Sequence, residues 1–290
     1  EVKKLGIRCA KFNPLKPFIS VVMNNRDHRK ILVIDGKVGY TGGINIADEY
    51  INLIERFGYW KDTGIRIEGP AVDNFTSMFL EMWDFSEGTQ ENVKKYLFCY
   101  EHDELPENDG FVLPYGDSPM DHEKIGENIY LNIVNRAKDY IYIFTPYLII
   151  DNEMMTALCN AAKSGVDIHI VTPGIPDKKL IFWLSQSYYD QLIEAGVNIH
   201  EYSPGFIHGK VFVCDDVIAT VGTINMDYRS LYLHYECGVW MFRTSIIEQI
   251  KKDALQTIKE SKTVTLEQCR HRSWGDKTIK GILRLFAPLL

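Results

Sequence analysis

Two short stretches of the sequence could address phosphate groups, because each places a histidine two positions before a lysine. His28 and Lys30 form the first pair, and His208 and Lys210 form the second. Residues two apart in an extended strand share a face, so the imidazole and the ammonium of a pair can reach the same ligand. A neutral imidazole can act as a nucleophile or base and an imidazolium as an acid, while an ammonium group neutralises anionic oxygens.

The two pairs belong to a repeated unit. Residues 28–45 align without gaps on residues 208–225, at an offset of 180 positions. Each copy runs from the His-x-Lys pair through an apolar strand and an aspartate to a glycine-bearing corner. One pair could arise by chance, but two complete copies with identical spacing indicate duplication of one module.

The corner of each copy supplies candidate ligands for phosphate oxygens. Gly43 permits close approach of the backbone to an anion, and Thr223 occupies the corresponding position in the second copy. Asn45 and Asn225 each offer an amide donor two positions later.

The aspartates of the two copies, Asp35 and Asp215, lie seven residues after their histidines. An odd separation places them off the face that carries the histidine and lysine of each pair. Each also opens an Asp-Gly or Asp-Asp pair, which is typical of a turn. We therefore predict that both aspartates fix turns and do not contact a ligand.

The remaining sequence predicts an α/β fold in which helices flank mixed β-sheets. Hydrophobic periodicity indicates helices at 70–85, 123–138, 152–164 and up to 195, with strands at 140–147 and 166–173. The first copy has no counterpart of 125–191 before it, so it is expected to be incomplete. The predicted domains are residues 1–110, residues 111–262 and a tail at 263–290, with an acidic linker at 101–119.

Composition excludes several classes of protein. The chain of 290 residues is 46% hydrophobic and 24% charged, which predicts a folded chain, and its net charge of -7 disfavours nucleic-acid binding. No apolar run approaches the roughly 20 residues of a membrane span, and no secretory signal opens the chain. The six cysteines form no CxxC pair, so we expect reduced thiols and no metal or other cofactor.

The tail differs in charge from the rest of the chain. Residues 262–290 hold six basic and two acidic residues, a net of +4, which leaves -11 for residues 1–261. Apolar and basic side chains alternate there at helical spacing. The apolar set is Ile279, Ile282, Leu283 and Phe286, and the basic set is Lys277, Lys280 and Arg284. The pattern suits a helix in a membrane interface, and equally a terminal helix packed on the core.

The pattern H-x-K-x4-D-x6-G-(G/S/T)-x-N, present twice, resembles the paired signature of the phospholipase D superfamily. Flanking segments resemble the bacterial cardiolipin synthases across nearly the whole chain: TGGINIADEY, FGYWKDTGIRIEGPAV, LPYGDSP, IFTPYLI, VGTINMDYRS and RLFAPLL. Gly209 stands where that branch commonly has alanine. The resemblance implies two phospholipase D-type domains packed with pseudo-twofold symmetry, the first copy incomplete, with membrane-spanning helices expected upstream.

The resemblance also implies an activity. A phosphatidyltransferase of this kind moves a phosphatidyl group between two phosphatidylglycerol molecules through a phosphohistidine and releases glycerol. His28 would be the nucleophile and His208 the acid, in a near-symmetric pair whose roles could be exchanged. The groups expected to hold the phosphate oxygens are Lys30, Lys210, Asn45 and Asn225. The expected partners are phosphatidylglycerol and the anionic cytoplasmic face of a bacterial cell membrane, with no metal.

A histidine nucleophile needs a carboxylate that fixes its tautomer. Glu236 lies on the strand that follows His208, and Asp62 fills the corresponding place after His28. We therefore predict that Glu236 orients His208 and that Asp62 orients His28, the alternative being two solvated strand residues.

Two other functions remain open. A phospholipase or nuclease of the same superfamily would pass the intermediate to water, and the net of -11 outside the tail disfavours the nuclease. A catalytically silent fragment would only associate with a membrane or a partner chain, through the sheet edge and apolar surface that an incomplete first copy leaves open. Either transfer or hydrolysis requires both imidazoles to meet in one pocket.

Overall fold

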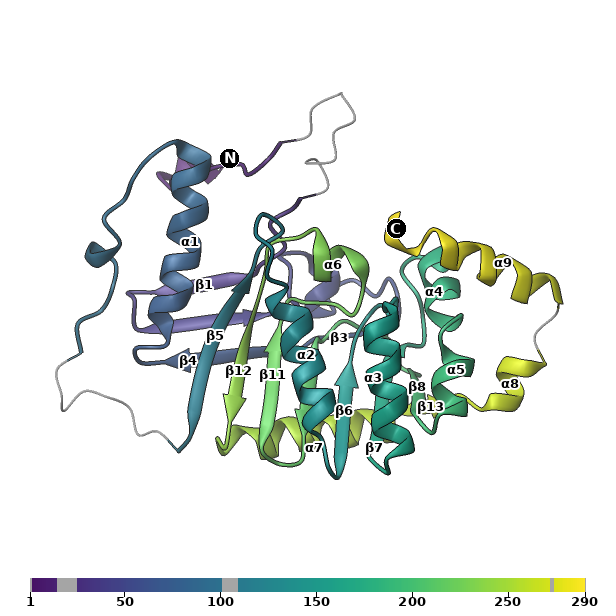
Figure 1. Cartoon of the computed structure of the whole chain (residues 1–290). Coiled ribbons are helices and arrows are strands. Elements are labelled where there is room, and N and C mark those ends of the chain that lie inside the picture. The colour runs from purple at the N-terminus through teal and green to yellow at the C-terminus, as the bar shows by residue number, and fades with distance from the viewer. Residues whose placement is uncertain (1, 15–24, 101–108, 272–273, 290) are drawn as a thin grey trace.

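The computed structural model describes residues 2–14, 25–100, 109–271 and 274–289, so residues 101–108 of the predicted linker lie outside the described part. Figure 1 shows two sheets of unequal size with helices packed around the larger one. The smaller sheet has the order β1-β2-β4 and is antiparallel throughout. Its strands are β1 (Ile31–Ile34), β2 (Val38–Gly42) and β4 (Gly64–Glu68).

The larger sheet has eight strands in the order β13-β8-β7-β6-β10-β11-β12-β5. Strands β6, β7 and β8 run parallel and the other neighbours antiparallel, so this sheet is mixed, as predicted. Its strands are β5 (Phe111–Asp117), β6 (Tyr140–Phe144), β7 (Asp167–Pro173), β8 (Asn198–Tyr202), β10 (Val211–Cys214), β11 (Ile218–Gly222), β12 (Glu236–Phe242) and β13 (Ser261–Thr263). A separate parallel pair joins β3 (Tyr59–Lys61) to β9 (Gly205–Ile207).

Helices lie at the predicted places in part: the segment expected to form one helix up to residue 195 forms two, and three of the helices between residues 228 and 270 were not predicted. The α-helices are α1 (Val72–Glu87), α2 (Ile125–Arg136), α3 (Asn152–Lys163), α4 (Lys179–Gln186), α5 (Tyr189–Glu194), α6 (Tyr228–Tyr232), α7 (Ile246–Lys259), α8 (Leu266–Arg270) and α9 (Trp274–Leu285). Short 3-10 helices are η1 (Val2–Leu5), η3 (Asp48–Ile51), η4 (Val93–Lys95) and η6 (Ala287–Leu289).

The large sheet is covered on both faces. Helices α2, α3, α4 and α5 pack on one face through a core that includes Tyr130, Leu158 and Phe212. Helix α7, α1 and the small sheet share the opposite face, where Phe75 and Val213 belong to a second core. Double coverage explains the continuous apolar runs of β6 and β10, in which every residue is buried.

The two hairpins that follow the histidine motifs have the same register. Ile31 pairs with Thr41 in the first copy and Val211 with Val221 in the second, again 180 positions apart. Their surroundings differ, because β10 continues the sheet through β6 whereas β1 is an edge strand among the described residues. Leu32 on β1 is exposed.

The tail forms helix α9, which packs against α4 and ends near α6. Lys280 is buried and donates to Gln186, and the guanidinium of Arg284 lies 4.3 Å from the ring centroid of Tyr188. These two cations therefore face the protein. The exposed apolar residues are Ile282, Leu285 and Phe286. The side chains of Lys277 and Ile279 lie outside the described part.

Helices long and apolar enough to cross a bilayer do not occur among the residues that the structure describes.

Candidate active site

Each histidine motif is joined at its start to a segment of the other copy. The main-chain N–H of His28 donates to the carbonyl of Tyr235, 2.9 Å away and immediately before β12. The main-chain N–H of His208 donates to the carbonyl of Lys61, 2.7 Å away at the end of β3. Strand β3 also pairs with β9, which leads directly into His208. The residue that follows each carbonyl carries a carboxylate, so the motifs meet the carboxylates of their opposite copies.

The pairing of histidines with carboxylates is therefore crossed, and our prediction of pairing within each copy is wrong. His28 Nδ1 lies 2.9 and 3.0 Å from the two carboxylate oxygens of Glu236. His208 Nδ1 lies 2.8 Å from Oδ2 of Asp62. When Nδ1 donates its proton to the carboxylate, the lone pair of each ring is on Nε2, which is the atom that can attack or accept a proton.

Both carboxylates are held ionised despite their burial. Burial acts to raise the pKa of Glu236, but the charge of His28, the nearby ring of His234, and the hydrogen bonds of His28 and Thr223 outweigh it and lower the pKa to about 2. Burial likewise opposes ionisation of Asp62, and the hydrogen bond from His208 with the charge of Lys210 lowers its pKa. An ionised acceptor beside Nδ1 is what fixes the tautomer of each ring.

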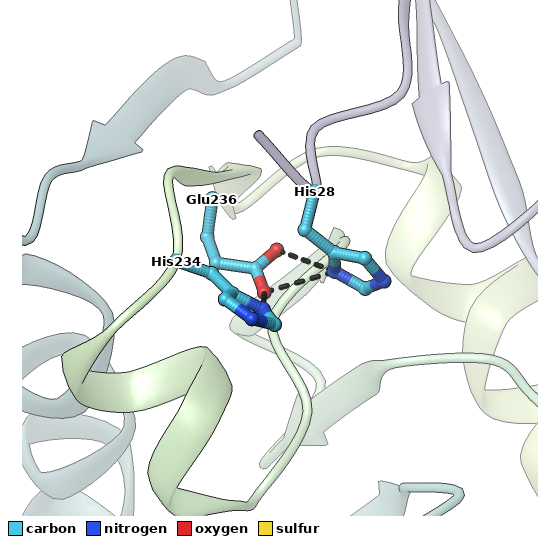
Figure 2. A group of neighbouring side chains, drawn as sticks. All are labelled: His28, His234 and Glu236. Carbon is cyan, nitrogen blue, oxygen red and sulfur yellow. Dashed lines mark hydrogen bonds and ion pairs between the residues drawn. The ribbon is translucent and has the colours of Figure 1, made fainter. Parts of the chain in front are cut away.

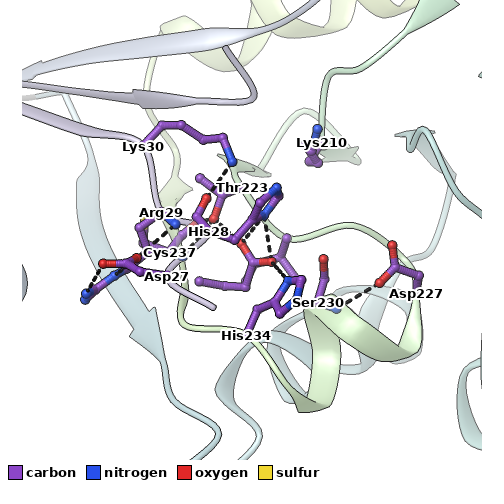
Figure 3. A network of polar contacts seen from close by, with 12 residues as sticks. Asp27, His28, Arg29, Lys30, Lys210, Thr223, Asp227, Ser230, His234 and Cys237 are labelled. Carbon is purple, nitrogen blue, oxygen red and sulfur yellow. Dashed lines mark hydrogen bonds and ion pairs between the residues drawn. The ribbon is translucent and has the colours of Figure 1, made fainter. Parts of the chain in front are cut away.

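Figure 3 shows Lys30 beside His28, the histidine that precedes it. Lys30 Nζ donates to the carbonyl of His28 at 2.6 Å, and Lys210 Nζ donates to that of His208 at 2.5 Å. Burial lowers the pKa of Lys30, and it lowers that of Lys210 to about 7. Burial and the positive charge of Lys210 also lower the pKa of His208 to about 3, so without a bound anion this ring is neutral at pH 7.

Both histidines line one cavity of about 540 Å³, together with Asn45 and Asn225. Asn45 Nδ2 donates to the hydroxyl of Tyr50, 2.7 Å away. The Oδ1 atom of the buried Asn225 has no hydrogen-bond partner among the described residues. A buried amide oxygen without a partner is costly unless a ligand or water supplies a donor, so this wall of the cavity is suited to a polar ligand.

The corner residues Gly43 and Thr223 lie against the carboxylates of Asp62 and Glu236. They do not form two identical anion-binding sites. A Cβ atom on Gly43 would lie 2.2 Å from Oδ1 of Asp62 and 2.8 Å from the carbonyl of His208, so only glycine leaves room there. Thr223 at the equivalent position donates its hydroxyl to Glu236. Each corner therefore supports the carboxylate of its own copy, which orients the histidine of the other.

The two aspartates of the motifs lie in the turns where the sequence placed them. Asp35 and Asp215 have φ angles of 53° and 52° at the ends of β1 and β10. The carboxylate of Asp215 accepts from the main-chain N–H groups of Lys138, Asp139 and Tyr140 at 2.7 to 3.0 Å. Asp215 therefore ties the hairpin to the start of β6, which is a structural role.

His234 lies two positions before Glu236 in the sequence. In the structure its ring lies beside that carboxylate, next to the ring of His28 (Figure 2). Its Nδ1 atom lies 3.7 Å from Oε1 of Glu236, and the ring centroids of His234 and His28 are 5.6 Å apart. The ring also lines the cavity. Its spacing from Glu236, equal to that of the His-x-Lys pairs, was the available signal.

Comparison with known proteins agrees with the fold. Residues 130–258 match the family described as "Cardiolipin synthase, PLD-like domain". The solved phosphatidylserine synthase of Haemophilus influenzae superimposes with a TM-score of 0.68 at 14% identity, covering 91% of this chain and 69% of that one. The chain belongs to the phospholipase D superfamily.

Within the superfamily, the similarity over the whole chain is to cardiolipin synthases. The chain is 36% identical over 291 residues to the cardiolipin synthase of Halalkalibacterium halodurans, and all of it is covered. It is 52% identical over 290 residues to an uncharacterized protein of Streptococcus mutans. The chain spans 58% and 62% of the lengths of these two relatives, respectively.

Proposed function

We propose that this chain carries the reaction centre of a phosphatidyltransferase that resembles cardiolipin synthase. The observation that carries the proposal is the crossed arrangement of two carboxylate-oriented histidines around one cavity. Cardiolipin synthase relatives aligned over the entire chain favour phosphatidylglycerol as donor and acceptor. We further propose domains at 1–110 and 111–262, related by duplication, with a tail at 263–290.

In the first step, Nε2 of His28 attacks the phosphorus of phosphatidylglycerol. The P–N bond forms as the P–O bond to the glycerol head group breaks, and the departing oxygen takes a proton from Nε2 of protonated His208. In the second step, a hydroxyl of another phosphatidylglycerol returns its proton to His208 and attacks phosphorus, and the P–N bond breaks. Cardiolipin and one glycerol result, and His28 is regenerated.

The positive groups of the site support this sequence of steps. His208 is neutral in the empty site because of burial and the charge of Lys210. A phosphodiester anion bound near Lys30 and Lys210 offsets their charge, which favours proton uptake by His208 before the leaving group departs. The lysines and the amides of Asn45 and Asn225 would then stabilise the charge that develops on the phosphate oxygens.

We propose that the substrate reaches this centre from the anionic cytoplasmic face of a bacterial cell membrane. The exposed apolar side chains of α9, at Ile282, Leu285 and Phe286, are suited to contact with acyl chains. The net charge of -7 for the chain as a whole does not favour a polynucleotide substrate.

Incubation with labelled phosphatidylglycerol vesicles tests the proposal. Transfer predicts cardiolipin and glycerol, and His28→Ala and His208→Ala should each lower the rate by several orders of magnitude. His122→Ala is a matched control, because His122 is exposed and does not line the cavity. Phosphatidic acid as the sole lipid product would support a hydrolase instead. If no product forms even in a version extended by the upstream region of its relatives, the silent-fragment interpretation replaces ours.

A further inference from the structure

We propose that His28, His234 and Glu236 form a binding site for a single transition-metal cation of the Zn²⁺ type, and that its occupancy blocks the reaction centre. Each of the three residues offers one ligand atom, and these atoms lie within 4.8 Å of one another. Figure 2 shows both rings turned toward the same carboxylate. The metal-independent transfer proposed above neither needs nor assigns this site.

The state of His234 is the second observation that points to a ligand. Both ring nitrogens are shielded from solvent, and neither has a hydrogen-bond partner among the described residues. The distance of 3.7 Å from Nδ1 to Glu236 is too long for a hydrogen bond. Buried polar atoms without a partner are rare in folded proteins, and an ion is one of the few things that satisfies them.

The donor set suits zinc. Two imidazoles and one carboxylate, with a fourth position left open, are a ligand combination that Zn²⁺ adopts in proteins. Glu236 is fully buried, and its carboxylate is the anionic ligand of the set. Zinc ligands lie about 2.0–2.2 Å from the ion, so the three side chains would close in by about an ångström.

A positively charged lysine beside the site is expected to make binding of the cation reversible. Lys30 lies close enough to Glu236 for the two charges to interact, and it repels a cation bound to that carboxylate. This repulsion weakens binding relative to that of a resident structural zinc. Metal would therefore compete with the hydrogen bond between His28 and Glu236 rather than replace it permanently.

A cation bound at this site would prevent His28 from acting as the nucleophile, because it would change which ring nitrogen carries the proton. The cation takes the lone pair of His28 Nδ1, and the single proton of the neutral ring moves from Nδ1 to Nε2. Nε2 then has no lone pair with which to attack phosphorus. This part of the inference rests on the proposed function, whereas binding of the cation does not.

The experiment uses the full, tag-free chain after removal of metals with EDTA and dialysis. Co²⁺ serves as a spectroscopic probe, and Zn²⁺ competes with it. We expect one Co²⁺ per chain with the visible absorption of a low-symmetry four-coordinate site, displaced by Zn²⁺. His234→Asn and His234→Gln should weaken both metals at least about tenfold. His271→Asn is the matched control, because His271 also lies beside a glutamate, Glu267 at 3.4 Å, but is exposed.

A second arm measures transfer of the phosphatidyl group at increasing Zn²⁺. The concentration for half-inhibition should rise at least about tenfold in His234→Asn relative to the unchanged chain, and EDTA should restore activity. The proposal fails if Co²⁺ does not bind, if both His234 variants bind it as tightly as the unchanged chain, or if His271→Asn weakens it equally. If the chain binds metal as expected but shows no transfer activity, even when extended by the upstream region of its relatives, the proposed function would be overturned and the metal site would stand.

Discussion

His28 and Glu236 are 208 positions apart in the chain, yet Nδ1 of the histidine lies 2.9 Å from Oε1 of the glutamate. The reciprocal pair, His208 and Asp62, joins the copies in the opposite direction at 2.8 Å. Neither copy therefore contains a complete oriented imidazole by itself. Docking of the two copies is a requirement for the site and not only for stability.

The crossed pairs predict a reciprocal effect of two carboxylate substitutions. Glu236→Gln should alter the tautomer of His28 and leave His208 unchanged, whereas Asp62→Asn should do the reverse, because an amide can also donate to Nδ1. Nitrogen-15 NMR of the imidazoles reports the tautomers directly. Each substitution should lower the transfer rate about 10²- to 10⁴-fold. An effect of either substitution on the histidine of its own copy alone would contradict the crossed pairing.

Burial of a neutral His208 predicts a loss of stability in acid. Its pKa is lowered to about 3 in the folded chain, whereas the unfolded residue titrates near 6.5, so the unfolded state binds more protons between these values. The contribution is complete above pH 6.5 and declines by up to about 1.4 kcal/mol per pH unit as the pH falls toward 3. Urea unfolding at pH 7, 6, 5 and 4, in comparison with His208→Gln, measures it. Identical slopes for the two proteins would refute this prediction.

The two motif aspartates should differ in their effects on stability. Asp215→Asn replaces one of the carboxylate oxygens that accept three main-chain N–H groups, so the free energy of unfolding should fall by about 1.5–3 kcal/mol. Asp35→Asn is the matched control, because its φ is nearly the same and its carboxylate accepts no hydrogen bond among the described residues. It should change stability by less than about 0.5 kcal/mol. Chemical denaturation measures both, and equal losses would argue against the turn-fixing role of Asp215.

Helix α9 predicts that vesicle binding depends on its outward apolar residues. Substitution of Ile282, Leu285 and Phe286 by serine should reduce sedimentation with phosphatidylglycerol vesicles, because each side chain is at least half exposed and available to the acyl boundary. The control is Leu255→Ser on α7, an exposed leucine on a different helix. Equal binding by the two variants would place the membrane contact elsewhere.

Much of the fold was predictable because it depends on local patterns. The apolar runs that became β6 and β7, and the periodic segments that became α1, α2 and α3, lie within a few residues of their predicted ranges. The repeat at an offset of 180 positions predicted a duplicated module, and both copies form hairpins of the same register. Turn chemistry placed Asp35 and Asp215 correctly, since a turn is decided by neighbouring residues.

In the tail, the local sequence pattern does not predict which face of the helix contacts the protein. Amphipathic spacing predicted a helix, but either face of such a helix can meet the protein. Lys280 donates to Gln186, and the guanidinium of Arg284 lies over the ring of Tyr188. Both long side chains are therefore directed toward the protein. The face that remains outside is apolar, and no spacing rule could have specified this.

By itself, the sequence determined which residue types the site contains, since His-x-Lys, Asp62 and Glu236 were recognisable from composition and spacing. Only the tertiary structure decided which carboxylate serves which histidine and that His234 joins them. The physical reason is that the main-chain bonds from His28 to Tyr235 and from His208 to Lys61 form between segments distant in sequence. Such contacts depend on how the two copies dock, and local patterns within the sequence of each copy do not specify that arrangement.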